Sequence, residues 1–417
     1  MTTLPGLLRQ NRNYRYTWMG QVVSEIGDYF NNVAVLALVM EKSGSGMVVS
    51  GVFLSRAIPA VLAGPVAGVL LDRFDRRRIM IASDLLRALV AAAFVFTVHR
   101  QRPWLLYLLS AVLMFASPFF TAGRAAILPS IASKEEIHAA NSLTQTTSWA
   151  TLTAGTLLGG LGAAALGYHA AFLLNAVSFV FSAWCIWKIA WRAAPAPAAI
   201  RASGTRDFID GLRYIASVPL IAGIAMISFG WALGGGAAQV LFALFGEQVF
   251  HRGATGIGDI WGFAGIGLLL GGTLGHVVGR RAGFPAYKRA VTVSYLVHGA
   301  AYMLFSRTGS FAAALLLMML SRVGMAVTSI LNNSQLLRHT APAYRGRVFA
   351  TMEALRNAVM IVSMAAAGIA SQYAGPRTLA LIAGALGSAT AIAWAWLDAA
   401  GRLPEPPDTG ESSPPPG

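Results

Sequence analysis

The side chains best suited to chemistry in this sequence are ionisable groups inside long apolar segments. The first such segment carries Glu25, Asp28 and Asn32 at spacings of three and four residues, which places them on one helical face. Charged groups in a bilayer cost about 2.5–3.5 kcal/mol each even on the lower scales, so they need partners or water. At about 1.5 Å per residue, Asp28 lies at nearly the depth of Arg56 in the next segment, and we expect the two to pair.

The second half of the chain holds a similar set of charges. Arg322 and Glu353 fall at comparable depths, about 10–12 Å from the same side, and Arg356 follows one turn after Glu353. One interpretation is that these charges form static ion pairs that fix the register of the helices. We favour the other, in which at least one acid faces a cavity and exchanges a proton as the protein changes conformation. A carboxylate that loses its arginine partner in an apolar environment favours its protonated form, and the candidates are Asp28 first and Glu25 second.

Patterns of catalytic or metal-binding residues are absent from the sequence. It contains no nucleophile–base constellation, no Cys/His metal spacing and no nucleotide-binding P-loop. The single cysteine, Cys185, lies in an apolar run, which excludes an intrachain disulfide. We therefore expect no enzymatic activity, no metal, no cofactor and no direct use of ATP.

The composition indicates that the apolar segments lie in a lipid bilayer. Hydrophobic residues make up 56% of the 417 residues and charged residues only 12%, against about 25% charged in soluble domains. The net charge of +15 is attributed to basic cytoplasmic loops, since no soluble basic domain is present to bind nucleic acid. The Pro-rich tail at 399–417 is expected to be disordered and cytoplasmic.

Twelve segments are long enough to cross a bilayer, at about 20 apolar residues for each span. The stretch between His138 and Lys188 is too long for one span and is predicted to turn at Gly167–His169. Basic residues concentrate in the termini and the even-numbered connections, which places both termini in the cytoplasm. The predicted spans lie near 16–40, 47–71, 78–99, 103–127, 141–167, 168–190, 219–246, 256–279, 289–306, 310–337, 346–373 and 376–398.

The chain is predicted to divide into two halves. The longest polar interior stretch, 191–213, is interpreted as a cytoplasmic linker between bundles at 1–190 and 214–398. A weak internal repeat supports this division, because GVLLDR from Gly68 matches GHVVGR from Gly275. Such repeats are typical of secondary transporters, which hold substrate near the midplane between the halves. The predicted fold class is an all-α membrane protein with twelve transmembrane helices in two pseudo-symmetric six-helix bundles.

The loop after the second apolar segment carries the most specific motif. It reads GVLLDRFDRR and resembles the signature of the major facilitator superfamily between helices 2 and 3, roughly G-x-L-x-D-R-x-G-R-R/K, with Asp75 in place of the usual second glycine. The resemblance implies a cytoplasmic gate that stabilises the outward-facing state. Its residues here are Gly68, Asp72, Arg73, Arg76 and Arg77.

Other segments resemble one branch of this superfamily, the bacterial exporters that include macrolide-efflux and enterobactin-export proteins. They are SDLLRA with Asp84 and Arg87, the segment from Ser117 that contains Arg124, and the loop Arg345–Val348. Asp84, Arg87 and Arg124 are therefore added to the expected gate. Within that gate we expect Asp72 to dock on the helix that begins near Gly346, because a helix amino terminus carries partial positive charge.

The fifth apolar segment carries a glycine motif, formed by Gly155, Gly159 and Gly160. Antiporters of the superfamily commonly show G-P-x-x-G-G here, and glycines at this spacing let neighbouring helices approach closely. Thr156 stands where the proline that bends the helix is usual. Candidates for lining an apolar cavity are the aromatic residues Tyr29, Phe30, Trp149, Phe229 and Trp231.

These observations predict a secondary transporter of the bacterial cytoplasmic membrane. The resemblance implies export of a drug-like or siderophore-like small molecule by alternating access, in exchange for protons. The expected partners are the substrate, protons and membrane lipids, without nucleic acid, and the chain is expected to be a monomer. The alternatives are an importer or lipid transporter of the same fold, or a membrane sensor that transports nothing.

Overall fold

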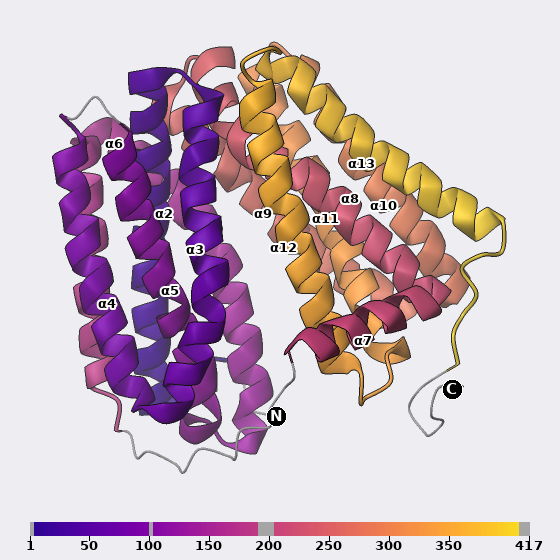
Figure 1. Ribbon diagram of the computed structural model, residues 1–417, viewed down its shortest axis with the longest axis horizontal. Coiled ribbons are helices and arrows are strands. Elements are labelled where there is room, and N and C mark those ends of the chain that lie inside the picture. Colours follow the sequence, from indigo (N-terminus) through magenta and orange to yellow (C-terminus); the bar gives the residue numbers. More distant parts are fainter. Residues whose placement is uncertain (1–3, 100–102, 191–203, 408–417) are drawn as a thin grey trace. The chain divides into compact units, whose positions relative to one another are not determined.

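The computed structural model describes residues 4–99, 103–190 and 204–407 (Figure 1). All regular structure in these ranges is helical, which agrees with the predicted all-α class. Most of the expected linker, 191–203, and the end of the tail, 408–417, lie outside the described residues. The chain forms two compact units, which we call the amino-terminal unit (described residues up to 190, with 242–265) and the carboxy-terminal unit (204–241, with 266–407).

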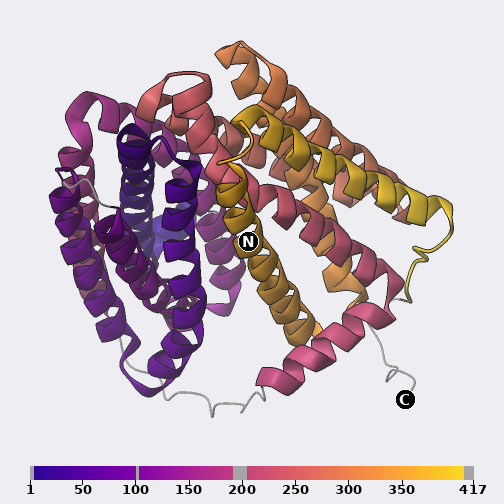
Figure 2. The same ribbon diagram turned by 45° about the horizontal axis from the view of Figure 1, so that its top comes forward.

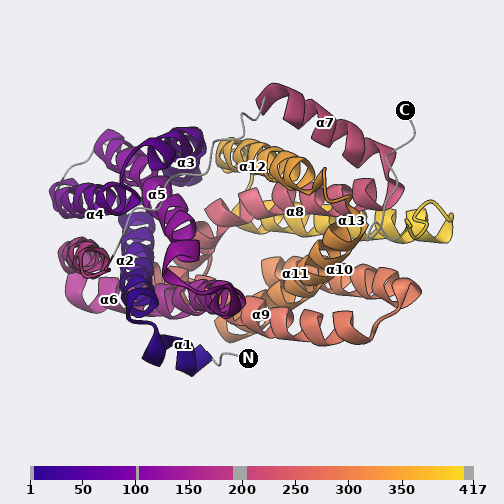
Figure 3. The ribbon, with the colours of Figure 1, turned by 90° about the horizontal axis from the view of Figure 1, so that it is seen from below.

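The amino-terminal unit is built around α2, which is buried on every side at residues 33–40. Figure 2 shows the indigo and magenta helices of this unit running side by side, and Figure 3 shows α3, α4 and α5 gathered beside α2. A short 3-10 turn at Phe94–Thr97 follows α4. The helices are α1 (Leu4–Gln10), α2 (Arg12–Ser43), α3 (Gly46–Arg73), α4 (Arg76–Ala93), α5 (Trp104–Ile131) and α6 (Lys134–Trp187).

The 54-residue α6 is a hairpin of two arms. Gly167 interrupts it with φ 78° and ψ 168°, a conformation that glycine adopts without steric cost. The first arm packs beside α2 through Gly155 against Tyr29, and the second arm packs beside the same helix through Ser178 against Gly27. The turn predicted at Gly167–His169 is therefore confirmed.

Ten of the described helices are long and apolar enough to cross a membrane. One of the ten is α6, whose two arms lie on either side of Gly167. The predicted span at 289–306 falls within α10 (Phe284–Arg307), which is not among the ten and carries Lys288, Arg289 and His298. The chain is thus a multi-pass membrane protein.

The core of the carboxy-terminal unit joins α8, α10, α11 and α13 through aromatic side chains. Tyr287, Tyr295 and Trp394 are almost fully buried in it. An ion pair of 2.5 Å between Lys288 Nζ and Asp398 Oδ1 ties α10 to α13. The helices are α7 (Gly204–Ser217), α8 (Pro219–Leu244), α9 (Gly253–Arg281), α10, α11 (Phe311–His339), α12 (Arg345–Ala370) and α13 (Pro376–Ala399), of which the end of α8 and the start of α9 belong to the amino-terminal unit.

The amphipathic helix α7 begins within the segment predicted as a linker and crosses the lower end of α12 (Figure 1). Arg347, near the start of α12, pairs with Asp207 at 2.8 Å and with Asp210 at 3.6 Å. Tyr214 stacks on Tyr344 with ring centroids 4.9 Å apart. These contacts fix α7 to the first turn of α12.

Gly211 of α7 packs closely against α12. A Cβ atom there would lie 2.3 Å from Thr351 Oγ1 and 2.8 Å from the carbonyl oxygen of Arg347. We expect Gly211→Leu to lower the free energy of unfolding by about 1–3 kcal/mol, because α7 must move off α12 to make room. Thermal unfolding in detergent measures this. The control is Gly204→Leu, where nothing lies within 4 Å, and equal effects of both substitutions would refute the close packing.

Candidate functional site: an interior charge cluster and a cavity

The carboxylate of Glu25 is held inside the amino-terminal unit by donors from three helices. Its Oε1 accepts hydrogen bonds from Gln21 Nε2 at 2.9 Å and Ser148 Oγ at 3.1 Å, and its Oε2 accepts from Thr151 Oγ1 at 2.6 Å. Arg124 Nη1 of α5 lies 3.5 Å from Oε1. Because these donors come from α2, α5 and α6, the carboxylate links all three helices.

Asp28 lies one turn further along α2 and shares an arginine with a second acid. Arg87 Nη1 is 3.9 Å from Asp28 Oδ2, while Arg87 Nη2 donates to Asp84 Oδ1. Asp84 is 0% exposed and Arg87 3%. The guanidinium also lies 4.3 Å from the ring centroid of Phe179 and 4.8 Å from that of Phe120, in the range of a cation–π contact. Arg87 therefore lies between the two carboxylates and is the ion-pair partner of both.

Arg56 has different partners from the one expected. It donates to Asn31 Oδ1 at 3.0 Å and to Asn32 Oδ1, whereas the ion pair of Asp28 is with Arg87. The two asparagines lie one turn beyond Asp28 on α2, and their amide oxygens accept the hydrogen bonds of the Arg56 guanidinium. The expected pair of Asp28 and Arg56 is thus replaced by two separate contacts.

The structure brings together residues that the sequence assigned to two different sites. We call Glu25, Asp28, Asp84, Arg87 and Arg124 the interior charge cluster. Asp84, Arg87 and Arg124 were expected in the cytoplasmic gate, but their ion pairs are with each other and with the acids of α2. The cause is helix geometry, because these residues face the interior of the bundle from α4 and α5.

The signature loop between α3 and α4 ties helix ends of the amino-terminal unit together. Arg76 donates to the carbonyl of Ala126 on α5 at 2.9 Å, and Arg77 donates to that of Ile186 on α6 at 3.2 Å. Asp72 is 59% exposed, with its Oδ1 4.0 Å from Arg76 Nη2. Arg73 is exposed, and nothing lies within 4 Å of a Cβ atom built at Gly68.

The glycine motif lies where α6 packs closely against its neighbours. A Cβ atom at Gly155 would lie 2.9 Å from the Tyr29 side chain, and one at Gly159 3.1 Å from the backbone of Phe30. At Gly160 it would lie 2.8 Å from the carbonyl oxygen of Ala254 on α9. The first two glycines thus serve the contact with α2 and the third the contact with α9.

Gly160 is expected to tolerate no side chain. We predict that Gly160→Ala lowers the free energy of unfolding by about 1–3 kcal/mol, because the obstacle is backbone rather than a flexible side chain. Thermal unfolding in detergent checks this against Gly64→Ala on α3, where the added methyl group meets nothing within 4 Å. A drop of the same size in both variants would show that helical glycines here have no packing role.

The predicted charges of the carboxy-terminal unit fall into two places. Glu353 Oε2 accepts from Arg356 Nη2, and Glu353 Oε1 accepts from Asn357 Nδ2 at 3.2 Å, all on α12. Arg322 is buried on α11, with Nη1 3.6 Å from the Met325 sulfur. The pair of Glu353 and Arg356 alone faces open space.

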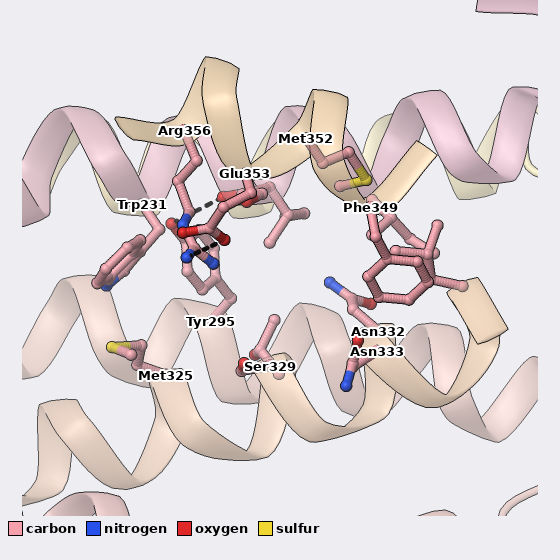
Figure 4. A pocket seen from close by; sticks show the side chains of 15 residues that line it. Trp231, Tyr295, Met325, Ser329, Asn332, Asn333, Phe349, Met352, Glu353 and Arg356 are labelled. Atoms are coloured by element: carbon pink, nitrogen blue, oxygen red, sulfur yellow. Dashed lines mark hydrogen bonds and ion pairs between the residues drawn. The ribbon is translucent and has the colours of Figure 1, made fainter. Parts of the chain in front are cut away.

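That space is a cavity of about 440 Å³ inside the carboxy-terminal unit (Figure 4), a size typical of small-molecule sites. The side chains of Glu353 and Arg356 point into it beside Trp231 and Tyr295. Among the described residues, no group of three His, Cys, Asp or Glu side chains is placed to hold a metal ion. The lining residues are Ile224, Ile227, Ser228, Trp231, Tyr295, Met325, Thr328, Ser329, Asn332, Asn333, Leu336, Phe349, Met352, Glu353 and Arg356.

Sequence reasoning identified part of this site. Trp231 was correctly anticipated as a cavity residue, whereas Tyr29 and Phe30 pack against the glycines of α6. Asn332 and Asn333 were missed, although two adjacent amides inside a 29-residue apolar helix are a usable signal. Ser148 and Thr151, the donors to Glu25, were missed because hydroxyl side chains occur in many membrane helices.

A many-helix membrane protein with a cluster of charges among its helices and a cavity of this size has the features of a solute transporter. The chain matches the Major Facilitator Superfamily over residues 17–361. It belongs to that family, as the signature loop led us to expect.

Relatives named as export or efflux proteins resemble this chain over larger or smaller parts of its length. A putative bacilysin exporter of Bacillus subtilis (strain 168) is 26% identical over 343 residues, which cover 82% of this chain and 84% of that one. Macrolide efflux protein A of Streptococcus pyogenes is 34% identical over 124 residues, covering 29% of this chain and 30% of that one. The expected resemblance to bacterial efflux proteins is confirmed.

Solved structures share the fold. An auto-inhibited peptide transporter of the POT family aligns with a TM-score of 0.73 at 12% sequence identity, over 96% of this chain and 99% of that one. At this identity the likeness concerns the fold alone.

Proposed function

We propose that this protein is a proton-coupled exporter of small molecules in the bacterial cytoplasmic membrane. In this proposal the chain crosses the membrane twelve times, as two six-helix bundles with both termini in the cytoplasm. The twelve spans are the ten helices described above, with α6 counted as two, together with α10. The names of the relatives, which refer to efflux and export, favour the outward direction.

The single observation that carries the proposal is the interior charge cluster. Glu25 and Asp28 stand one turn apart on α2, and each depends on an arginine from a different helix, Arg124 on α5 and Arg87 on α4. A relative movement of these helices separates an acid from its arginine, and the acid then takes up a proton. A carboxylate that alternates in this way between pairing and protonation couples proton flow to the change of conformation.

The two remaining groups of predicted residues receive roles consistent with this cycle. The cavity beside Glu353 and Arg356 provides part of the substrate site. The exposed carboxylate of Asp72 acts as a cytoplasmic gate by docking on the amino terminus of α12 when the cytoplasmic side is closed. Arg76 and Arg77 hold the ends of α4, α5 and α6 in place for that contact.

Transport into inverted membrane vesicles tests the proposal. A pH gradient, acidic inside, is monitored with a fluorescent dye while macrolides, siderophores and short peptides are added in turn. An exporter that exchanges protons for substrate dissipates part of the gradient when its substrate arrives, and vesicles lacking the protein do not respond. Accumulation only in right-side-out vesicles would indicate an importer, and no substrate-dependent flux in either orientation would favour a sensor.

A further inference from the structure

The cavity of the carboxy-terminal unit carries two opposite charges on one wall. Glu353 and Arg356 pair with each other within α12, yet their side chains remain 52% and 37% exposed, respectively. Both line the cavity, and Figure 4 shows them at the end occupied by Trp231 and Tyr295. The pair is therefore open to a ligand inside the cavity.

This pair contributes little to the fold. Exposed ion pairs stabilise a protein by about 0–1 kcal/mol, whereas a charge within a membrane-spanning helix carries a cost of about 2.5–3.5 kcal/mol even on the lower scales. Two charges that contribute so little to stability, and that are kept accessible in a cavity, are placed to meet a ligand.

The charge balance of the wall selects the ligand. A simple cation would draw Glu353 away and leave the Arg356 guanidinium without a counter-charge, and a simple anion would do the reverse. A molecule that carries both charges satisfies both side chains at once. The indole face of Trp231, at the same end of the cavity, adds a cation–π partner for an ammonium group.

The rest of the lining selects an uncharged body. Among the described residues that line the cavity, all side chains other than Glu353 and Arg356 are uncharged. Hydroxyl and amide groups are interspersed among aliphatic, aromatic and methionine side chains, for example Ser329, Asn332 and Asn333 on α11 (Figure 4).

We propose that this cavity binds zwitterionic small molecules with an apolar body, of which an aromatic amino acid or a short apolar peptide is the simplest form. The ammonium group lies at Glu353 and the carboxylate at Arg356, where the guanidinium fork matches its two oxygens. This inference rests on the proposed function, since it names the class of compound that the exporter carries.

Binding of defined probes to the purified full-length protein tests the inference without any transport. Phenylalanine, alanyl-phenylalanine and phenylalanyl-phenylalanine are titrated in detergent by calorimetry, each beside its N-acetylated and its amidated form. We expect at least one parent compound to bind about tenfold or more tightly than either blocked form, because each blocked form loses one charged contact. This comparison uses the wild-type protein, so it does not depend on the folding of a variant.

Two substitutions assign the contacts. Glu353→Gln is expected to weaken binding of the parent compound about tenfold and to leave the affinity for the N-acetylated form unchanged. Arg356→Gln is expected to weaken binding of the parent compound similarly and to leave the affinity for the amidated form unchanged. Asp398→Asn is the matched control, because it removes an ion pair of the same unit, that with Lys288, outside the cavity.

Two results would overturn the inference. One is that none of the three zwitterions binds saturably, and the other is that blocked and parent forms bind equally. Either result leaves the proposed function intact if the vesicle assay still shows proton-coupled export of another compound. Conversely, if the zwitterions bind selectively but the vesicles show no flux, the proposed exporter function is contradicted and the proposed binding site is retained.

Discussion

Replacing Arg87 with methionine is expected to lower the free energy of unfolding by about 3–5 kcal/mol, as for other buried ion pairs that lose one partner. The substitution removes the counter-charge of Asp84, which is fully buried, and of Asp28, and it ends the contacts with the rings of Phe120 and Phe179. Methionine retains most of the length and apolar volume of the side chain. The effect therefore reports the loss of charge, and unfolding followed by circular dichroism in detergent measures it.

Two further variants make this result specific. Arg78→Met changes an exposed arginine on the same helix and is expected to alter stability by less than about 0.5 kcal/mol. The double variant Arg87→Met with Asp84→Asn removes one positive and one negative buried charge. We expect it to regain much of the stability that Arg87→Met loses. If Arg87→Met unfolds as Arg78→Met does, the interior charge cluster has no stabilising role.

The largest expected effect on transport is that of Asp28→Asn. An asparagine at this position keeps the shape of the side chain but neither holds nor releases a proton, so transport driven by a pH gradient is expected to fall to background. Exchange of labelled for unlabelled substrate across the membrane requires no net proton movement and is expected to continue. Proteoliposomes prepared with and without the gradient separate the two activities.

The control for this prediction lies on the same helix. Glu41 is an exposed acid near the end of α2 that accepts a hydrogen bond from Tyr168 at 2.5 Å, and Glu41→Gln makes the same chemical change away from the cluster. We expect it to retain gradient-driven transport. Full gradient-driven transport by Asp28→Asn would remove Asp28 from the coupling mechanism and leave Glu25 as the candidate.

Much of the fold could be predicted because lipid imposes strict lengths on membrane helices. The helices begin and end near the predicted positions, and the turn at Gly167 followed from a run too long for a single span. The family was predictable because the signature loop combines Gly68, Asp72, Arg73, Arg76 and Arg77 in a fixed order. Each of these features is local in sequence.

The partners of the buried charges could not be predicted in the same way. Counting residues from the ends of the helices placed Asp28 and Arg56 at the same depth in the membrane. Such a count gives neither the rotation of a helix about its axis nor the identity of its neighbours. In the structure α4 presents Arg87 to Asp28, while the amides of Asn31 and Asn32 take Arg56. These partners depend on how α2, α3 and α4 pack together, and the spacing of residues along the sequence does not show that packing.

The cavity was only partly predictable for a related reason. Glu353, Arg356 and Trp231 were each singled out by residue type, yet they come from two helices far apart in the sequence. Tyr295 and Asn332, from two further helices, complete the wall. Side chains that share a cavity without sharing a segment become evident only once the helices are packed.

The central claim is that the acids of α2 couple proton flow to the change of conformation. Proton release on substrate binding tests this claim most directly. The purified protein in weakly buffered detergent is mixed with a compound that passed the vesicle assay, and the change of pH is recorded. We predict that the wild-type protein releases protons on binding and that Glu25→Gln with Asp28→Asn binds without releasing any. Binding without proton release by the wild-type protein, or unchanged release by the double variant, would contradict the mechanism.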